Sequence, residues 1–265
     1  MGELPNLEEL MSLRGKRALI TGAAAGIGRA VALRFAQAGA ALELVDIDRA
    51  GLEAVRSELA NFPGGAQAHP ADLSRKQEID RLWVGLRADP PGILVNNAGI
   101  YPFKPFLKMD EALYRHVMET NLSSTYWMCQ HMIGARLKLG GVIINFGSIE
   151  AVLPFKEDLA HYSVSKAGVV ALTRALAKEH ARHGFRVNAL LPGGVLTPGT
   201  RAAARQIFRF NFGLLKSGLQ FRQRLPAGRA GQPDEVARMA LVLASDLASY
   251  VHGAAIPVDG GFLAA

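Results

Sequence analysis

The chain has a single cysteine, Cys129, among its 265 residues. One cysteine cannot form an intramolecular disulfide, and it cannot supply the several thiolates of a cysteine-based zinc site. We therefore expect Cys129 to be a small core residue and the protein to hold no metal. A chain without disulfides fits a reducing compartment, so the expected location is the cytoplasm.

Long hydrophobic runs are absent as well. No apolar stretch reaches the roughly 18–20 residues that a membrane-spanning helix needs. The N-terminal residues include Glu3, Glu8 and Glu9, so they lack the basic and then hydrophobic layout of a secretory signal peptide. These absences predict a soluble protein without a membrane partner.

The excess of positive charge is moderate, because 30 Lys and Arg against 23 Asp and Glu leave a net charge of +7. A basic excess can indicate nucleic-acid binding. Here the basic residues are spread along the chain, and no aromatic-basic stacking motif accompanies them. We expect no nucleic-acid partner, since solubility and anionic small ligands explain the charge as well.

What the chain does have is an alternation of short apolar runs with longer helical patterns. Apolar runs that predict buried strands occur at 17–21, 41–45, 67–69, 93–95, 142–146, 186–191 and 255–258. Helical patterns lie between them, notably at 110–138, 162–183 and 234–248. No linker or repeat interrupts the alternation, so it predicts one α/β domain over 1–265. Its doubly wound, mostly parallel sheet is expected to have helices on both faces.

A phosphate-binding layout follows the first predicted strand. The turn Gly22-Ala-Ala-Ala-Gly26-Ile-Gly28 leads into an Ala-rich helical run. Glycines there let the backbone approach a pyrophosphate at the positive end of the helix. The spacing differs from the commonest dinucleotide fingerprint, and a glycine-rich turn without a ligand is the competing interpretation. Asp46 ends the second strand, where it either binds an adenosine ribose or closes a turn.

Further small and polar residues follow the carboxyl ends of later strands, where open α/β sheets bind ligands. Asp72 is equally consistent with a turn acid and a ligand contact. The turn Asn96-Asn97-Ala98-Gly99 suits a cofactor edge, and Ser148 and Pro192-Gly193 each follow a strand. These separate signals converge on one rim of the sheet.

The stretch Tyr162-Ser-Val-Ser-Lys166 is the candidate for the chemistry. A spacing of four places both side chains on one face of a helix. A fixed positive charge favours a phenolate, so Lys166 is expected to lower the pKa of Tyr162 toward neutrality. Alone the pair is a weak signal, because a packed ring beside a solvated amine is common. Asn121 lies within the 110–138 pattern, where it is either exposed or disturbs the helix for a purpose.

In their order and spacing, over nearly the whole chain, these motifs resemble those of the short-chain dehydrogenase/reductase family. The resemblance implies a Rossmann-type fold with a seven-stranded sheet and an NAD(P)-dependent oxidoreductase. It implies that Tyr162 is the catalytic acid/base and that Lys166 lowers its pKa and holds the nicotinamide ribose. Ser148 would then bind the reacting oxygen, and Asn121 would order a water in the proton relay. The implied cofactor contacts are Gly22, Gly26, Ile27, Gly28, Asp46, Asp72, Leu73, Asn97, Ala98, Gly99, Tyr162, Lys166, Pro192, Gly193, Val195 and Thr197.

The expected cofactor is NAD, because the carboxylate of Asp46 would repel the 2′-phosphate of NADP. Arg29 and Arg49 leave NADP as the less favoured alternative, since either side chain is close enough in sequence to reach a phosphate. The resemblance also implies a homotetramer that packs through the helices at 110–138 and 162–183.

The expected substrate is a small alcohol or ketone that contacts Ser148, Glu150, Tyr162 and Gly193. Polar residues around Glu150 favour a sugar or polyol. The alternative is a 3-oxoacyl thioester on an acyl carrier protein, whose phosphate would meet the basic, Phe-rich segment 199–225. That segment is predicted to form a lid over the substrate. A dinucleotide-binding regulator without turnover is the remote third possibility.

Overall fold

The structure is a computed structural model that describes residues 5–200 and 224–265. Seven parallel strands form a central sheet in the order β3-β2-β1-β4-β5-β6-β7. The strands are β1 (Arg17–Thr21), β2 (Ala41–Asp46), β3 (Ala66–Pro70), β4 (Ile93–Asn96), β5 (Gly141–Phe146), β6 (Phe185–Pro192) and β7 (Ala255–Val258). All seven predicted strands are confirmed, with ends that shift by at most one residue. The strand order reverses at β1 and β4, which opens a ligand crevice at their carboxyl ends.

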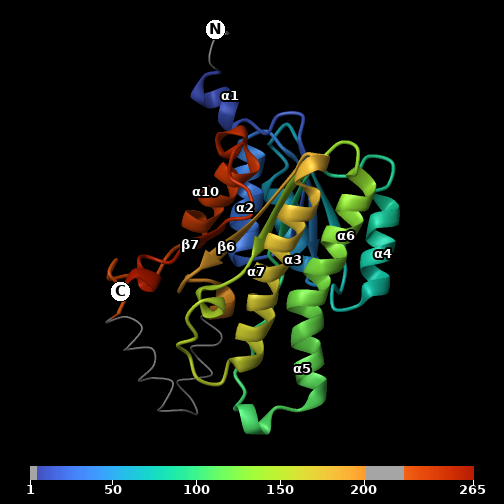
Figure 1. Ribbon diagram of the computed structural model, residues 1–265. Helices are drawn as coiled ribbons and strands as arrows, with labels where there is room; N and C mark the ends of the chain where they lie inside the picture. Colours follow the sequence, from blue (N-terminus) through green and yellow to red (C-terminus); the bar gives the residue numbers. More distant parts are fainter. Residues whose placement is uncertain (1–4, 201–223) are drawn as a thin grey trace.

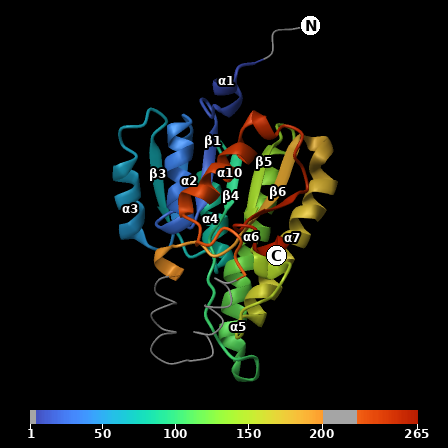
Figure 2. The ribbon, with the colours of Figure 1, turned by 90° about the vertical axis from the view of Figure 1, so that its left-hand side faces the viewer.

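Helices cover both faces of the sheet, as predicted for a doubly wound fold (Figure 1). Those described are α1 (Leu7–Met11), α2 (Gly26–Gln37), α3 (Arg49–Glu58), α4 (Lys76–Gly85), α5 (Glu111–Met118), α6 (Ser124–Arg136), α7 (Ala160–His180) and α10 (Pro233–Ala244). Helices α2, α3 and α10 share one core cluster with the sheet, and α4, α6 and α7 share the other. Figure 2 shows α10 lying across its face of the sheet. Among the described residues, no helix is both long and apolar enough to cross a bilayer.

The strands are buried on both faces, which explains why they are continuous apolar runs and not alternating patterns. In β1, Ala18 and Ile20 pack into the cluster with α2 and α10, whereas Leu19 packs into the cluster with α4 and α6. All three side chains have no exposed surface. The sheet is therefore a rigid support for the loops at its carboxyl edge.

Two predicted helices are confirmed with shifted ends. The helix predicted at 162–183 begins at Ala160 and ends in a 3-10 turn before Gly184, whose φ of 76° closes it. The helix predicted at 234–248 starts with Pro233 in its first turn and a capping box formed by Gln232 and Glu235. It ends at Ala244, and a separate 3-10 turn follows.

The helix predicted at 110–138 is interrupted. A π-helical turn at Glu119–Ser123 separates α5 from α6, and Asn121 lies inside that turn. The Thr125 hydroxyl donates to the Asn121 carbonyl at 3.1 Å, which helps to satisfy the altered backbone pattern. The interpretation of Asn121 as an exposed helix residue was therefore wrong, because its side chain has no exposed surface.

Candidate active site

Two adjoining cavities lie at the carboxyl edge of the sheet and share Ile27, Asn97, Gly99 and Thr197 in their walls. We call them the Asp46 cavity and the Tyr162 cavity. The Asp46 cavity contains these predicted residues: Gly22, Gly26, Ile27, Asp46, Asp72, Leu73, Asn97, Ala98, Gly99 and Thr197. The Tyr162 cavity contains these: Ile27, Asn97, Gly99, Ser148, Glu150, Tyr162, Lys166, Pro192, Gly193, Val195 and Thr197. Of the predicted site residues, Gly28 and Asn121 line neither cavity.

Gly28 acts by permitting close packing of the glycine turn. A Cβ atom there would lie 2.0 Å from the Gly22 carbonyl oxygen, so no larger residue fits without backbone movement. Gly22 has a φ of 66°, in the left-handed region that favours glycine. Ala25 is the N-cap of α2 and provides no side-chain cap. The N–H groups of the first turn therefore remain available to an anion, which fits a dinucleotide pyrophosphate.

Asp46 lies at the end of β2 and lines the cavity that bears its name. Its carboxylate accepts hydrogen bonds from the N–H groups of Ala24 at 3.0 Å and Asp48 at 3.1 Å. These bonds orient the carboxylate beside the glycine turn. Nearby Arg29 donates to Glu58 at 2.9 and 2.6 Å, so its guanidinium already has an anionic partner.

The turn after β4 connects the two cavities. The Asn97 amide donates to the carbonyl oxygens of Thr21 at 3.0 Å and Gly22 at 3.1 Å. The Thr21 hydroxyl accepts from the backbone N–H groups of Asn97 and Ala98. These bonds fasten the turn to the glycine loop and so join the walls of the two cavities.

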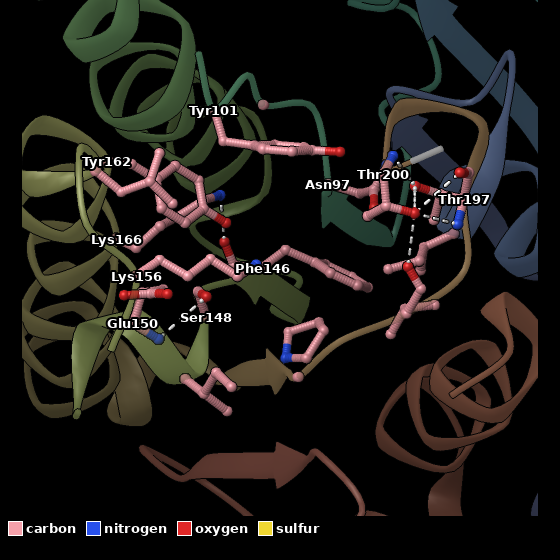
Figure 3. A pocket seen from close by; sticks show the side chains of 18 of the residues that line it. Asn97, Tyr101, Phe146, Ser148, Glu150, Lys156, Tyr162, Lys166, Thr197 and Thr200 are labelled. Carbon is pink, nitrogen blue, oxygen red and sulfur yellow. Dashed lines mark hydrogen bonds between the residues drawn. The ribbon is translucent and has the colours of Figure 1, made fainter. Parts of the chain in front are cut away.

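Tyr162 and Lys166 lie one helical turn apart on α7 and line the same cavity (Figure 3). The Lys166 Nζ donates to the Phe146 carbonyl at 2.8 Å and lies 5.9 Å from the centroid of the Tyr162 ring. Burial raises the pKa of Tyr162 to about 12, while the Ser148 hydroxyl acts to lower it. Burial also lowers the pKa of Lys166 to about 8.

The prediction that Lys166 draws the Tyr162 pKa toward neutrality therefore fails in this geometry. Spacing along the helix places the two side chains on one face, but the ammonium is directed to the Phe146 carbonyl and not to the phenol oxygen. Loss of hydration is the largest cause of the raised Tyr162 pKa, and the charge of Lys166 is not among its causes.

Asn121 reaches the site through its hydrogen bonds. Its Oδ1 accepts from the Ile100 N–H at 2.8 Å, and its Nδ2 donates to the Ile100 carbonyl at 2.8 Å and to Ser165 Oγ at 3.1 Å. The side chain thus joins the turn after β4 to helix α7. A role for Asn121 in the proton path stays a prediction.

Glu150 and Lys156 form a polar wall of the Tyr162 cavity. Glu150 is only 3% exposed, and its Oε2 accepts from the Phe155 N–H at 3.2 Å. Burial raises the pKa of the Glu150 carboxyl, and the charge of Lys156 opposes that rise. Burial lowers the pKa of the half-buried Lys156. The two charges therefore stabilise each other beside the cavity.

Tyr101 is a site residue that the sequence analysis missed. Its ring meets the Tyr162 ring edge to face, with centroids 5.9 Å apart, and its hydroxyl extends toward Thr197 across the cavity (Figure 3). Burial raises the pKa of Tyr101. The available signal was its position two residues after Gly99, in a turn already assigned to the rim.

The predicted lid at 199–225 lies almost wholly outside the described residues, which omit 201–223. Its described ends lie at the site. Thr200 lines the Tyr162 cavity, and Leu225 packs against Ile149 and Phe262.

Comparison with known proteins gives concordant matches. A family model described as enoyl-(acyl carrier protein) reductase matches residues 22–263. A galactitol 2-dehydrogenase (L-tagatose-forming) from Cereibacter sphaeroides is 38% identical, over 94% of this chain and 96% of the relative. A 3-oxoacyl-(acyl-carrier-protein) reductase from Thermotoga maritima is 35% identical, over 96% of this chain and 100% of the relative.

The fold is shared with solved structures. A putative NAD(P)-dependent gluconate 5-dehydrogenase from Beutenbergia cavernae, with bound NADP, superposes with a TM-score of 0.89. It is 36% identical, and the match covers 97% of this chain and 100% of that one.

Proposed function

The chain belongs to the short-chain dehydrogenase/reductase family of NAD(P)-dependent oxidoreductases, and on this premise we propose that it interconverts a secondary alcohol of a sugar or polyol with the corresponding ketone, using NAD. The observation that carries the substrate proposal is the polar wall of Glu150 and Lys156 in the Tyr162 cavity. Similarity to a galactitol dehydrogenase supports it. A hydroxylated substrate offers hydrogen bonds to both side chains.

The proposed catalytic groups are Tyr162, Ser148 and Lys166. In oxidation, the Tyr162 phenolate removes the proton of the substrate hydroxyl, and in reduction the phenol returns it. The Ser148 hydroxyl donates a hydrogen bond to the reacting oxygen as its charge changes. A bound nicotinamide supplies the hydride chemistry. The Lys166 ammonium holds the nicotinamide ribose in this proposal.

Asn121 holds the turn that carries Gly99 against α7, so it positions the residues between the two cavities. In this proposal the proton path from Tyr162 passes through the contact between α7 and the turn after β4, which Asn121 holds together. The predicted role of Asn121 in ordering a water belongs to the same proposal.

The proposed preference for NAD depends on Asp46. Its fixed carboxylate would repel a 2′-phosphate, whereas it can accept hydrogen bonds from ribose hydroxyls. The pairing of Arg29 with Glu58 removes one of the two cations that would favour NADP. Because the gluconate 5-dehydrogenase structure carries NADP, the ratio of kcat/KM for the two cofactors is the necessary measurement.

Reduction of a 3-oxoacyl thioester is the second candidate, and similarity to the Thermotoga maritima reductase over its full length supports it. A turnover assay distinguishes the two candidate functions. It compares hexitols, pentitols and their ketoses with 3-oxoacyl thioesters as substrates. The polyol proposal expects dinucleotide-dependent turnover of at least one polyol. Turnover confined to the thioesters would overturn it.

We also propose a homotetramer that packs through the α5–α6 and α7 regions. Tyr114, Tyr126 and Val164 are 43%, 45% and 54% exposed on these helices, which is apolar surface that a partner subunit can cover. Sedimentation velocity tests the assembly, and a single monomer-mass species at micromolar concentration would contradict it. A cytoplasmic location stays a prediction.

A further inference from the structure

The proton transfer assigned to Tyr162 and the hydrogen bond assigned to Ser148 leave one buried group of the cavity unused. Glu150 Oε2 accepts from the Phe155 N–H, and the Lys156 N–H and the Ser163 side chain also act on the carboxyl to lower its pKa. Glu150 Oε1 is nevertheless buried and has no partner within normal hydrogen-bond distance among the described residues. An unpaired buried carboxylate oxygen is costly, because it has lost water and gained no donor. Such an oxygen on the wall of a cavity is suited to accept a hydrogen bond from a ligand.

The position of Glu150 is well defined by its neighbours. It lies in the 3-10 turn Ile149–Ala151, and its N–H donates to Ser148 Oγ at 3.2 Å. The Glu150 backbone is therefore held beside the hydroxyl proposed to bind the reacting oxygen, and the Phe155 N–H holds its carboxylate. Because both side chains line the same cavity, a substrate whose oxygen lies on Ser148 places its neighbouring groups toward Glu150.

The loop that carries Lys156 is also held at both ends. Phe155 packs against Phe262 with ring centroids 4.5 Å apart, and the Asp158 carbonyl accepts from the Lys104 N–H at 2.9 Å. Asp158 has a φ of 63°, in the left-handed region that aspartate adopts more readily than most residues. Lys156 thus extends from a loop held at both ends; its Nζ lies 5.2 Å from the centroid of the Phe155 ring, and the side chain lines the same cavity as Glu150.

The chemistry of this pair selects one kind of ligand. A carboxylate accepts hydrogen bonds, and an ammonium donates them. A hydroxyl can do both at once, donating to Glu150 and accepting from Lys156. The pair has no net charge when both groups are ionised, so it provides no surplus cation for a carboxylate ligand. An acyl chain has no donor for Glu150 Oε1.

We propose that Glu150 and Lys156 bind the hydroxyl on the carbon next to the reacting carbon, so that the enzyme selects vicinal diols and their α-hydroxyketones. This inference rests on the proposed polyol function and specifies which substrate hydroxyl is recognised. It makes Glu150 a specificity residue that contacts the substrate.

The test compares two substrates on three variants. The substrates are the best polyol of the turnover panel and its deoxy derivative that lacks the hydroxyl beside the reacting carbon. Glu150→Gln keeps the side-chain shape and an oxygen for the Phe155 N–H, but it replaces the free acceptor with an NH₂ donor. Lys156→Met removes the ammonium from a half-buried side chain. Glu157→Gln is the matched control, because Glu157 is exposed on the same loop.

Wild type should prefer the polyol over the deoxy derivative in kcat/KM. Glu150→Gln should lower kcat/KM for the polyol by about 10- to 100-fold, the range for one hydrogen bond to a charged group. It should change kcat/KM for the deoxy derivative by less than about 3-fold. Lys156→Met should reduce the preference in the same direction, and it serves as the second probe if Glu150→Gln does not fold. Glu157→Gln should retain the wild-type preference.

The outcomes separate this inference from the proposed function. Polyol turnover with an unchanged preference in both Glu150→Gln and Lys156→Met would overturn this inference alone. Turnover of 3-oxoacyl thioesters without any polyol turnover would overturn both. A wild-type preference for aldonates that Lys156→Met abolishes would show that the pair binds a carboxylate instead.

Discussion

The Asp46 cavity and the Tyr162 cavity share a wall, yet they are built by different means. Backbone geometry shapes the first: the glycine turn, the uncapped first turn of α2 and a carboxylate held by N–H groups. Buried ionisable side chains with shifted pKa values shape the second. A backbone site needs glycines at fixed spacing and therefore leaves a local motif. A side-chain site depends on which residues the tertiary packing brings together, so the same fold can carry many substrates.

The largest effect is expected from a variant that removes the chemistry of the Tyr162 cavity and leaves dinucleotide binding in the Asp46 cavity intact. Tyr162→Phe should lower kcat by at least about 10²-fold, because the ring remains while the proton donor is lost. Steady-state turnover measures this change. A fluorescence titration of the dinucleotide is the control, and its dissociation constant should stay close to the wild-type value. Near-normal turnover of Tyr162→Phe would show that Tyr162 is a packed ring without a catalytic role.

The pH dependence tests the electrostatics of the Tyr162 cavity. In the proposed mechanism oxidation needs the Tyr162 phenolate, and burial raises the pKa of that phenol to about 12. The kcat/KM for oxidation should therefore rise by up to about 10-fold per pH unit into the alkaline range, and less steeply above about pH 8, because burial lowers the pKa of the Lys166 ammonium that holds the nicotinamide ribose to about 8. Reduction needs the protonated phenol, which is present throughout that range, so Tyr162 should not limit it. A plateau for oxidation below about pH 8 would show that the Lys166 charge outweighs burial after all.

A single methyl group tests whether the backbone shapes the Asp46 cavity. Gly28→Ala places a Cβ atom 2.0 Å from the Gly22 carbonyl oxygen and should force the glycine turn to move. We expect the free energy of unfolding to fall by about 1–3 kcal/mol and dinucleotide affinity to fall about 10-fold. Thermal and denaturant unfolding with a binding titration measure both effects.

Gly134→Ala is the matched control for this change. Gly134 lies on α6, and apart from the backbone of that helix no atom lies within 4 Å of an added Cβ, so alanine should fit and should stabilise the helix by up to about 1 kcal/mol. Equal dinucleotide affinity in Gly28→Ala and wild type would contradict the close-packed description of the turn.

The smallest expected effect concerns the choice between NAD and NADP. Asp46→Asn keeps the side-chain shape and removes the charge, so the preference for NAD in kcat/KM should fall by about 3- to 10-fold. Asp48→Asn is the control, because asparagine can replace aspartate at the N-cap of α3. A wild-type preference for NADP would show that the interpretation of Asp46 is wrong.

The sequence by itself determined the seven strands, the glycine turn, the Asn96–Gly99 turn and the pairing of Tyr162 with Lys166 on one helix. Each is encoded by neighbouring residues: continuous apolar runs predict strands buried on both faces, and glycines predict turns with close backbone approach. That these motifs share one rim of the sheet also followed from the alternation of strands and helices.

Only the tertiary structure decided the remaining features. The π turn at Asn121 depends on contacts with Ile100 and Ser165, which are distant in sequence. Tyr101 enters the cavity only because the turn after β4 folds against α7. The pKa of Tyr162 rises because burial removes water, whereas helical spacing alone suggested the opposite. Local patterns do not show which polar side chains of a cavity lose water or which distant residues they meet, and both set the chemistry of the Tyr162 cavity.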